Sequence, residues 1–138
     1  MEVGGVTVVF NLGKNSAEVD VEATKALYKD RSYVNTKCCC PSCRNYVEKI
    51  RCTDKPVARF FSGIGVDPVK AESVWAYLPG DAPFTQRYHC VFPIVCTQYK
   101  IKDEESFSVI TDGFSVSFRE EEGKLFLVAD WTLPWISV

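Results

Sequence analysis

The chain has 138 residues, a length that suits one domain with a single hydrophobic core and is too short for two. Its 46% hydrophobic and 25% charged residues are ordinary for a folded globular protein and exclude a disordered chain. The 16 basic and 18 acidic residues are scattered and leave a net charge of -2, so the basic face that nucleic-acid-binding domains direct at phosphates is missing. We expect one domain over residues 1–138 with no nucleic-acid partner.

We expect neither a membrane anchor nor an export signal. No stretch approaches the ~20 continuous apolar residues of a membrane span. The first residues, Met1 to Gly5, lack the basic and apolar regions of a signal peptide. We therefore expect a cytoplasmic protein without a membrane partner, in which the seven cysteines are thiols.

The N-terminal part alternates apolar and polar residues. This period of two over residues 6–12 and 17–21, separated by turn residues 13–15, predicts a β-hairpin. Asp20 is a suitable N-cap, and it predicts a short helix that continues to Tyr28.

Three segments in the middle of the chain, residues 41–50, 56–64 and 68–78, share one apolar pattern. Each places apolar residues at i, i+3, i+4 and i+7, which is the stripe of an amphipathic helix. Each also begins with a proline, the residue that suits the first helical position. Gly63 and Gly65 mark the end of the second segment. The pattern predicts three helices in succession.

In the last third of the chain the apolar period returns to two. Residues 88–99 predict a strand that is interrupted at Pro93, because an interior strand does not easily carry proline. Residues 106–110 predict a further strand, and residues 114–118 and 125–131 predict a second hairpin. We expect an α+β fold, with an antiparallel sheet built from the N- and C-terminal hairpins and three or four helices grouped in the first half and middle.

The segment Cys40-Pro41-Ser42-Cys43 lies between an extended segment and a predicted helix start. Unpaired backbone N–H groups and the helix dipole at such a position favour the thiolate form of Cys40. The segment resembles the Cys-Pro-x-Cys active site of glutaredoxins and other thioredoxin-like oxidoreductases. That resemblance implies thiol–disulfide exchange by Cys40 and Cys43.

Two other interpretations of the cysteines stay open. Cys38, Cys40 and Cys43, with one distant ligand, form a candidate structural zinc site. Alternatively the thiols are simply packed, since Cys43 falls on the apolar helix stripe with Tyr46 and Val47 and free cysteines are commonly buried. We favour packed thiols and expect no cofactor, with zinc as the alternative.

Longer motifs suggest a family. The chain reads Cys-Pro-Ser-Cys-Arg-Asn-Tyr over residues 40–46, contains Asp-Pro before Trp75, and closes with Leu-Pro-Trp at 133–135. With these motifs it resembles a family of small uncharacterised bacterial cytosolic proteins. The resemblance implies no particular activity. The positions that it marks as a candidate ligand-binding site, beside the two cysteines, are Arg44, Asn45, Trp75 and Trp135.

These observations together favour a domain that binds a partner protein or a small molecule without catalysis. We expect the binding site in a groove between the helices and the sheet. The sequence does not predict the oligomeric state. Aromatic residues after the final strand, beginning with Trp131, are expected to hold the tail against the core.

Overall fold

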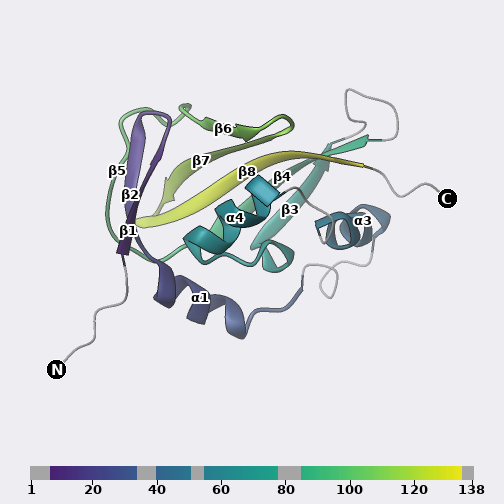
Figure 1. Cartoon of the computed structure of the whole chain (residues 1–138), viewed down its shortest axis with the longest axis horizontal. Coiled ribbons are helices and arrows are strands. Elements are labelled where there is room, and N and C mark those ends of the chain that lie inside the picture. Colours follow the sequence, from purple (N-terminus) through teal and green to yellow (C-terminus); the bar gives the residue numbers. More distant parts are fainter. Residues whose placement is uncertain (1–6, 34–39, 51–54, 78–84, 135–138) are drawn as a thin grey trace.

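The computed structural model describes residues 7–33, 40–50, 55–77 and 85–134. Its elements, in chain order, are β1 (Thr7–Leu12), β2 (Asn15–Asp20), α1 (Val21–Lys29), α3 (Pro41–Ile50), α4 (Lys55–Ile64), the 3-10 turn η1 (Pro68–Lys70), β3 (Ser73–Tyr77), β4 (Thr85–Pro93), β5 (Cys96–Lys100), β6 (Ser108–Thr111), β7 (Phe114–Glu121) and β8 (Lys124–Pro134) (Figure 1).

The strands form two antiparallel sheets. One has the order β1-β2-β5 and the other the order β3-β4-β8-β7-β6. The predicted α+β class and antiparallel pairing are confirmed. The prediction that the terminal hairpins alone build the sheet is wrong, because β3, β4 and β5 from the middle of the chain complete both sheets.

The main core lies between the five-stranded sheet and α4, which crosses one face of that sheet (Figure 1). Alternate residues of β7, from Phe114 to Phe118, are buried on this face, as the period of two predicts. Phe61 of α4 lies among the aromatic rings of the sheet, with ring centroids 5.2 Å from Phe92 and 5.4 Å from Phe114. This aromatic packing fixes α4 on the sheet.

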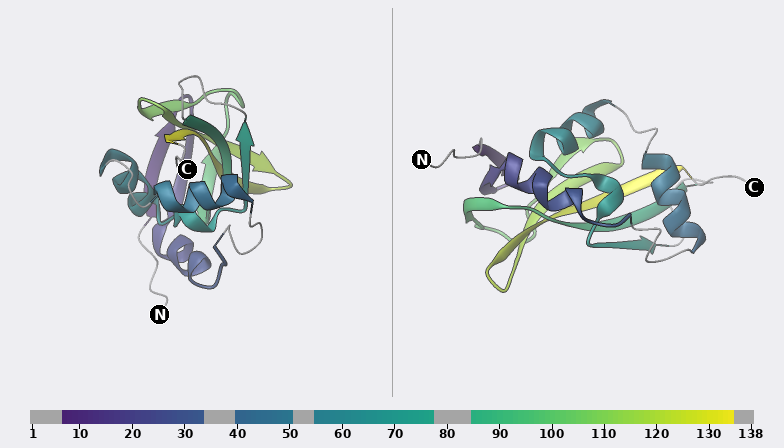
Figure 2. Two further views of the ribbon diagram at one scale, coloured as in Figure 1. Left: turned by 90° about the vertical axis from the view of Figure 1, so that its right-hand side faces the viewer. Right: turned by 90° about the horizontal axis from the view of Figure 1, so that it is seen from below.

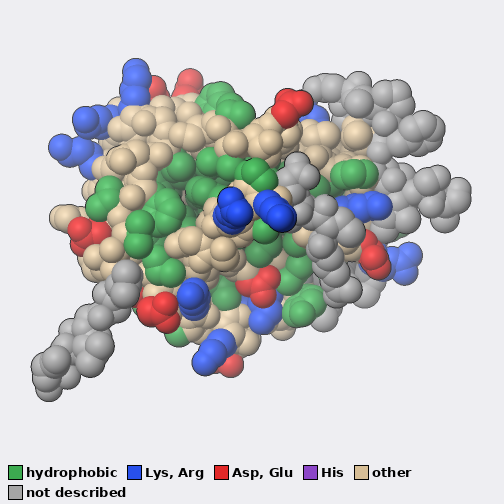
Figure 3. Space-filling view, viewed as in Figure 1, with side chains coloured by type: hydrophobic (Ala, Val, Ile, Leu, Met, Phe, Trp, Pro, Cys, Tyr) green, Lys and Arg blue, Asp and Glu red, His purple; other side chains and the backbone are tan. Residues whose placement is uncertain are grey.

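The N-terminal hairpin is confirmed, with Thr7 paired to Asp20 and Leu12 to Asn15. Phe10 of β1 contacts Phe60 of α4 edge-on at 6.3 Å, so the second sheet packs beside the same helix. Figure 3 shows apolar side chains gathered over the middle of the face seen in Figure 1, with Lys and Arg side chains lying among them as well as at the margin. The hairpin therefore extends the core instead of standing apart from it.

The chain changes sheets at a corner after β4. The predicted interruption is confirmed, because β4 ends at Pro93 and β5 begins at Cys96 in the other sheet. Helix α1 holds this corner: the Tyr28 hydroxyl donates to the Pro93 carbonyl at 2.7 Å, and the Val95 N–H donates to the Thr24 hydroxyl at 3.0 Å. A buried corner of this kind needs such partners for its backbone polar groups.

The third predicted helix, over residues 68–78, is wrong within the described residues. Asp67 does cap a turn, accepting the Val69 N–H, but only the three residues of η1 are helical. The chain then forms β3, whose residues pair with β4 from Ser73 opposite Val91 onward. Valine and tryptophan at 74 and 75 favour a strand, and pairing with the edge of β4 overrides the short helical pattern.

The other helices begin and end where local signals predict. The Asp20 side chain accepts the Ala23 N–H at 2.9 Å and caps α1. Helix α4 ends at Gly65, which has a φ of 87°, and the Val66 N–H donates to the Phe61 carbonyl at 3.0 Å. None of the helices in the described ranges is long and apolar enough to cross a membrane.

The same substitution is expected to have opposite effects at Gly63, inside α4, and at Gly65, which follows the last residue of α4. We expect Gly65→Ala to lower the free energy of unfolding by more than about 1 kcal/mol, because a left-handed residue with a Cβ is strained. The added Cβ would also lie 2.6 Å from the Val21 carbonyl oxygen. At Gly63 a Cβ meets nothing within 4 Å, so Gly63→Ala is expected to stabilise the protein by about 0.5–1 kcal/mol. Urea unfolding of both variants measures the difference, and equal effects would contradict the assignment of Gly65 as the helix stop.

Candidate ligand-binding site

Helix α3 is anchored to the sheet by Asn45, which is 1% exposed. Its Nδ2 donates to the Tyr88 hydroxyl at 3.0 Å and to the Pro134 carbonyl at 3.1 Å. The Tyr88 hydroxyl in turn donates to the Ser42 carbonyl at 2.8 Å, and burial raises the pKa of Tyr88 to about 12. The structure thus gives Asn45, a predicted ligand residue, the role of joining α3 to β4 and to the end of β8.

The remaining predicted ligand residues lie in different places. Arg44 is exposed on α3 beside Asn45. Trp75 is 66% exposed on β3, directly across from His89 of β4. Since Tyr88 faces α3 and successive strand residues alternate, His89 and Trp75 face the opposite side of the sheet. The structure does not bring Trp75 together with Arg44 and Asn45, and Trp135 lies outside the described residues.

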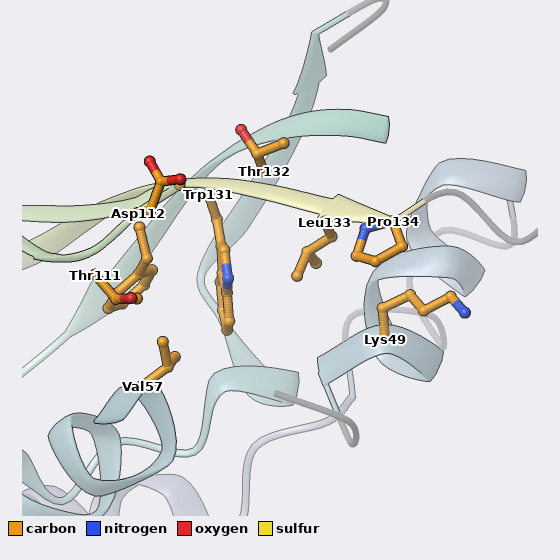
Figure 4. Close-up of a pocket in the computed structure, with 10 residues that line it drawn as sticks. Lys49, Val57, Thr111, Asp112, Trp131, Thr132, Leu133 and Pro134 are labelled. Atoms are coloured by element: carbon orange, nitrogen blue, oxygen red, sulfur yellow. The ribbon is translucent and has the colours of Figure 1, made fainter. Parts of the chain in front are cut away.

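A cavity of about 270 Å³ lies beside α3, between that helix, the start of α4, the β6–β7 turn and the end of β8 (Figure 4). Its lining residues are Lys49, Val57, Thr111, Asp112, Gly113, Phe114, Trp131, Thr132, Leu133 and Pro134. The cavity therefore adjoins two predicted features, the helix that carries Arg44 and Asn45 and the closing Leu-Pro-Trp segment.

Trp131 forms one wall of the cavity and is only 5% exposed. Its ring stacks on Phe61 at 5.4 Å, with further contacts to Phe114 at 4.8 Å and Tyr46 at 5.9 Å. The expectation that Trp131 packs on the core is confirmed. Figure 4 shows the indole descending from β8 between Val57 on one side and Leu133 on the other.

The indole N–H of Trp131 is a donor at this wall that stays in contact with solvent. Within the described part of the chain it has no acceptor at hydrogen-bond distance. No side-chain nitrogen or oxygen of that part is both sealed from solvent and unpaired. The N–H is therefore not sealed from solvent, and an acceptor from outside the protein can reach it.

The other walls of the cavity are partly apolar and partly polar, with Thr111, Asp112 and Thr132 beside Val57 and Leu133. Val57 and Leu133 are 3% and 4% exposed and point their side chains toward the indole (Figure 4). The amine of Lys49 is directed away from Trp131, and the Asp112 carboxylate points away from Val57 (Figure 4). A cavity with apolar walls on one side and an accessible indole N–H is suited to a small molecule that carries a hydrogen-bond acceptor.

The two cysteines of the Cys-Pro-Ser-Cys segment sit at the opposite end of α3. Cys40 is exposed, and its carbonyl accepts the Arg44 N–H at 3.1 Å, as expected of an N-cap residue. Its Sγ accepts the Cys43 N–H at 3.4 Å, while Cys43 is 8% exposed on the buried side of the helix. The Cys40 sulfur thus takes the place of a capping oxygen and is accessible to solvent.

The described residues supply no metal centre. No three His, Cys, Asp or Glu side chains among them are placed to hold one ion. Cys38, the third predicted zinc ligand, lies outside the described residues. Cys90 is fully buried, and burial raises the pKa of its thiol to about 12, which disfavours the metal-binding thiolate.

No family model, no curated protein and no solved structure matches the chain. The pairs between the described strands are all antiparallel, so the likeness to thioredoxin-like enzymes is confined to the cysteine segment.

The sequence-based prediction missed the residues that line the cavity. Lys49, Val57 and Trp131 come from three elements far apart in the chain, and no local spacing connects them. The available signal was indirect, namely a tryptophan and a proline at the end of a strand. Aromatic residues at such positions more often belong to the core than to a binding site, and Trp131 belongs to the core and also lines the cavity.

Removal of the Asn45 anchor has a measurable consequence. We expect Asn45→Ala to lower the free energy of unfolding by about 1–3 kcal/mol, because the Pro134 carbonyl and Tyr88 hydroxyl lose their shared donor. Arg44→Ala, a change at the exposed neighbouring position, is the control and should stay within about 0.5 kcal/mol. In a double-mutant cycle with Tyr88→Phe, the two losses should be less than additive. Strict additivity in urea unfolding would show that the pair is not coupled.

Proposed function

We propose that the protein binds a small, mostly apolar molecule, with one hydrogen-bond acceptor, in the cavity between α3, α4 and β8. The observation that carries this proposal is the nine-tenths-buried Trp131, whose indole N–H has no acceptor in the described part of the chain. The N–H reaches solvent, so a ligand acceptor would take the place of water as its partner.

The dimensions of the cavity limit the ligand. Its volume of about 270 Å³ lies at the lower end of the ~300–1,000 Å³ range of small-molecule sites. The walls contributed by Val57, Phe114, Trp131 and Leu133 favour an aromatic or branched aliphatic body.

Acetophenone and ethylbenzene form a matched pair of probes, because they have similar shapes and only acetophenone carries an acceptor. We expect acetophenone to shift the NMR resonance of the Trp131 indole N–H and to saturate. Ethylbenzene should bind about tenfold or more weakly, since it leaves the donor unpaired. Trp75→Phe and Trp135→Phe variants assign the indole resonances.

Two variants serve as controls for this experiment. Trp131→Phe removes the N–H and keeps an aromatic wall, so it should bring the two probes to equal affinity. Val57→Phe fills the cavity from the α4 side and should abolish binding of both. Equal binding of the two probes to the wild-type protein, or no shift of the Trp131 resonance, would contradict the proposal.

A second candidate function, thiol–disulfide exchange, is favoured by the geometry of Cys40 and Cys43. The exposed Cys40 sulfur accepts a backbone N–H at the start of α3, an arrangement that stabilises a thiolate. In this reaction the Cys40 thiolate attacks a substrate disulfide and forms a mixed disulfide, expelling one substrate thiolate. Cys43 then attacks Cys40, which releases the second substrate thiol and leaves a Cys40–Cys43 disulfide.

Single serine variants separate the two thiols. With glutathione disulfide as the oxidant, Cys43→Ser should accumulate a glutathione adduct on Cys40, because the resolving thiol is absent. Cys40→Ser should form no adduct at Cys43, which is buried. Peptide mapping by mass spectrometry locates the adducts, and the fully buried Cys90 is the internal control that stays unmodified until the protein unfolds. Equal labelling in both variants would rule out this function.

A further inference from the structure

A groove larger than the cavity lies between α1, β5 and the β7–β8 turn. Its volume is about 860 Å³. Leu27 of α1, Ile94 at the corner and Phe126 of β8 are among its apolar lining residues. Figure 2 shows the β7–β8 turn projecting beyond the rest of the sheet, so that one wall of the groove stands out from the body of the protein.

Strand β5 presents its edge to this groove. Every residue from 93 to 99 lines it, although successive side chains of a strand point to opposite faces. A groove that is lined by residues from both faces of the strand must run along the backbone edge of that strand. Among the described strands β5 pairs only with β2, at the end of the sheet β1-β2-β5, so its second edge has no strand partner there.

Strand β8 presents a second unpaired edge to the same groove. Lys124 and Leu125 pair with β7 on one side. On the other side the pairing with β4 stops at Phe126, opposite Pro93, because the chain leaves the sheet at that point. Both residues line the groove. The groove is therefore bounded by strand edges from both sheets, and edges of this kind recruit further strands.

The wall that carries β5 is already held in place. The Asp20 N–H donates to the Val95 carbonyl at 2.8 Å, and the Thr24 hydroxyl accepts the Val95 N–H. The Tyr28 hydroxyl fixes the Pro93 carbonyl. These bonds position the start of β5 before any ligand arrives, and a preorganised edge reduces the entropy lost on binding.

We propose that this groove binds an extended peptide segment of a partner protein, which adds as a strand between β5 and β8. The groove lies between α1 and the projecting β7–β8 turn, so its open strand edges are flanked on both sides and leave room for one added strand. The Arg31–Glu72 ion pair, 2.8 Å long, offsets two of the three charged lining residues, and Lys124 is the third. The peptide that fits has apolar side chains at alternate positions to contact Leu27 and Phe126.

The test uses the full chain and acetylated, amidated hexapeptides in which threonine alternates with valine, leucine or phenylalanine. Each peptide is compared with a version N-methylated at alternate residues, which keeps the side chains and loses backbone donors. We expect the unmethylated peptides to slow hydrogen exchange of the β5 amides and of residues 124–126. N-methylation should weaken binding by about tenfold or more.

Two exposed positions provide matched variants that are expected to fold. Leu27→Arg places a charge in the groove and should abolish binding, while Val9→Arg on β1 should leave it unchanged, since the two side chains are 37% and 60% exposed. If no peptide protects β5, or if methylated and unmethylated peptides bind equally well, strand addition is wrong. Protection of β5 that grows with protein concentration in the absence of peptide would overturn the proposal in favour of pairing between two copies.

Discussion

The corner at Pro93 to Val95 is the constraint on which both sheets depend. Strand β4 lies between β3 and β8, and proline cannot donate a hydrogen bond to such a ladder, so pairing with β8 ends where the proline stands. The chain then crosses to β2, and α1 holds it there through Thr24 and Tyr28. Pro93 thus marks the point where the chain passes from one sheet to the other, and it leaves open edges on β8 and on β5.

The core and the cavity share the residue Trp131. Trp131 is packed against Phe61 and Phe114 and at the same time forms a wall of the cavity with its indole N–H. The cavity exists because Asn45 ties α3 to the end of β8 while Phe61 fixes α4 on the sheet, which leaves a space between the two helices. The stability of the core and the shape of the candidate site are therefore set by the same contacts.

Sequence reasoning succeeded where the deciding interaction is local and failed where the partner is distant. Val74 and Trp75 fit a helical stripe, yet they form β3, because the open edge of β4 offers backbone partners that no periodicity reveals. Asn45, predicted as a ligand-binding residue, is an anchor whose partners come from β4 and β8. Arg44 is exposed beside Asn45. Trp75 lies on the opposite face of the sheet, because its position is set by the pairing of β3 with β4 and not by a helical stripe.

The sequence by itself determined the cap of α1 at Asp20, the end of α4 at Gly65 and the hairpin between β7 and β8. Each of these depends on residues only a few positions apart, whose hydrogen bonds and turn conformations are available to a short segment. Only the tertiary structure decided the partners of β3 and β5, the cavity at Trp131 and the groove beside α1. These features arise from contacts between distant segments, and side-chain periodicity within one segment carries no information about which other segment it meets.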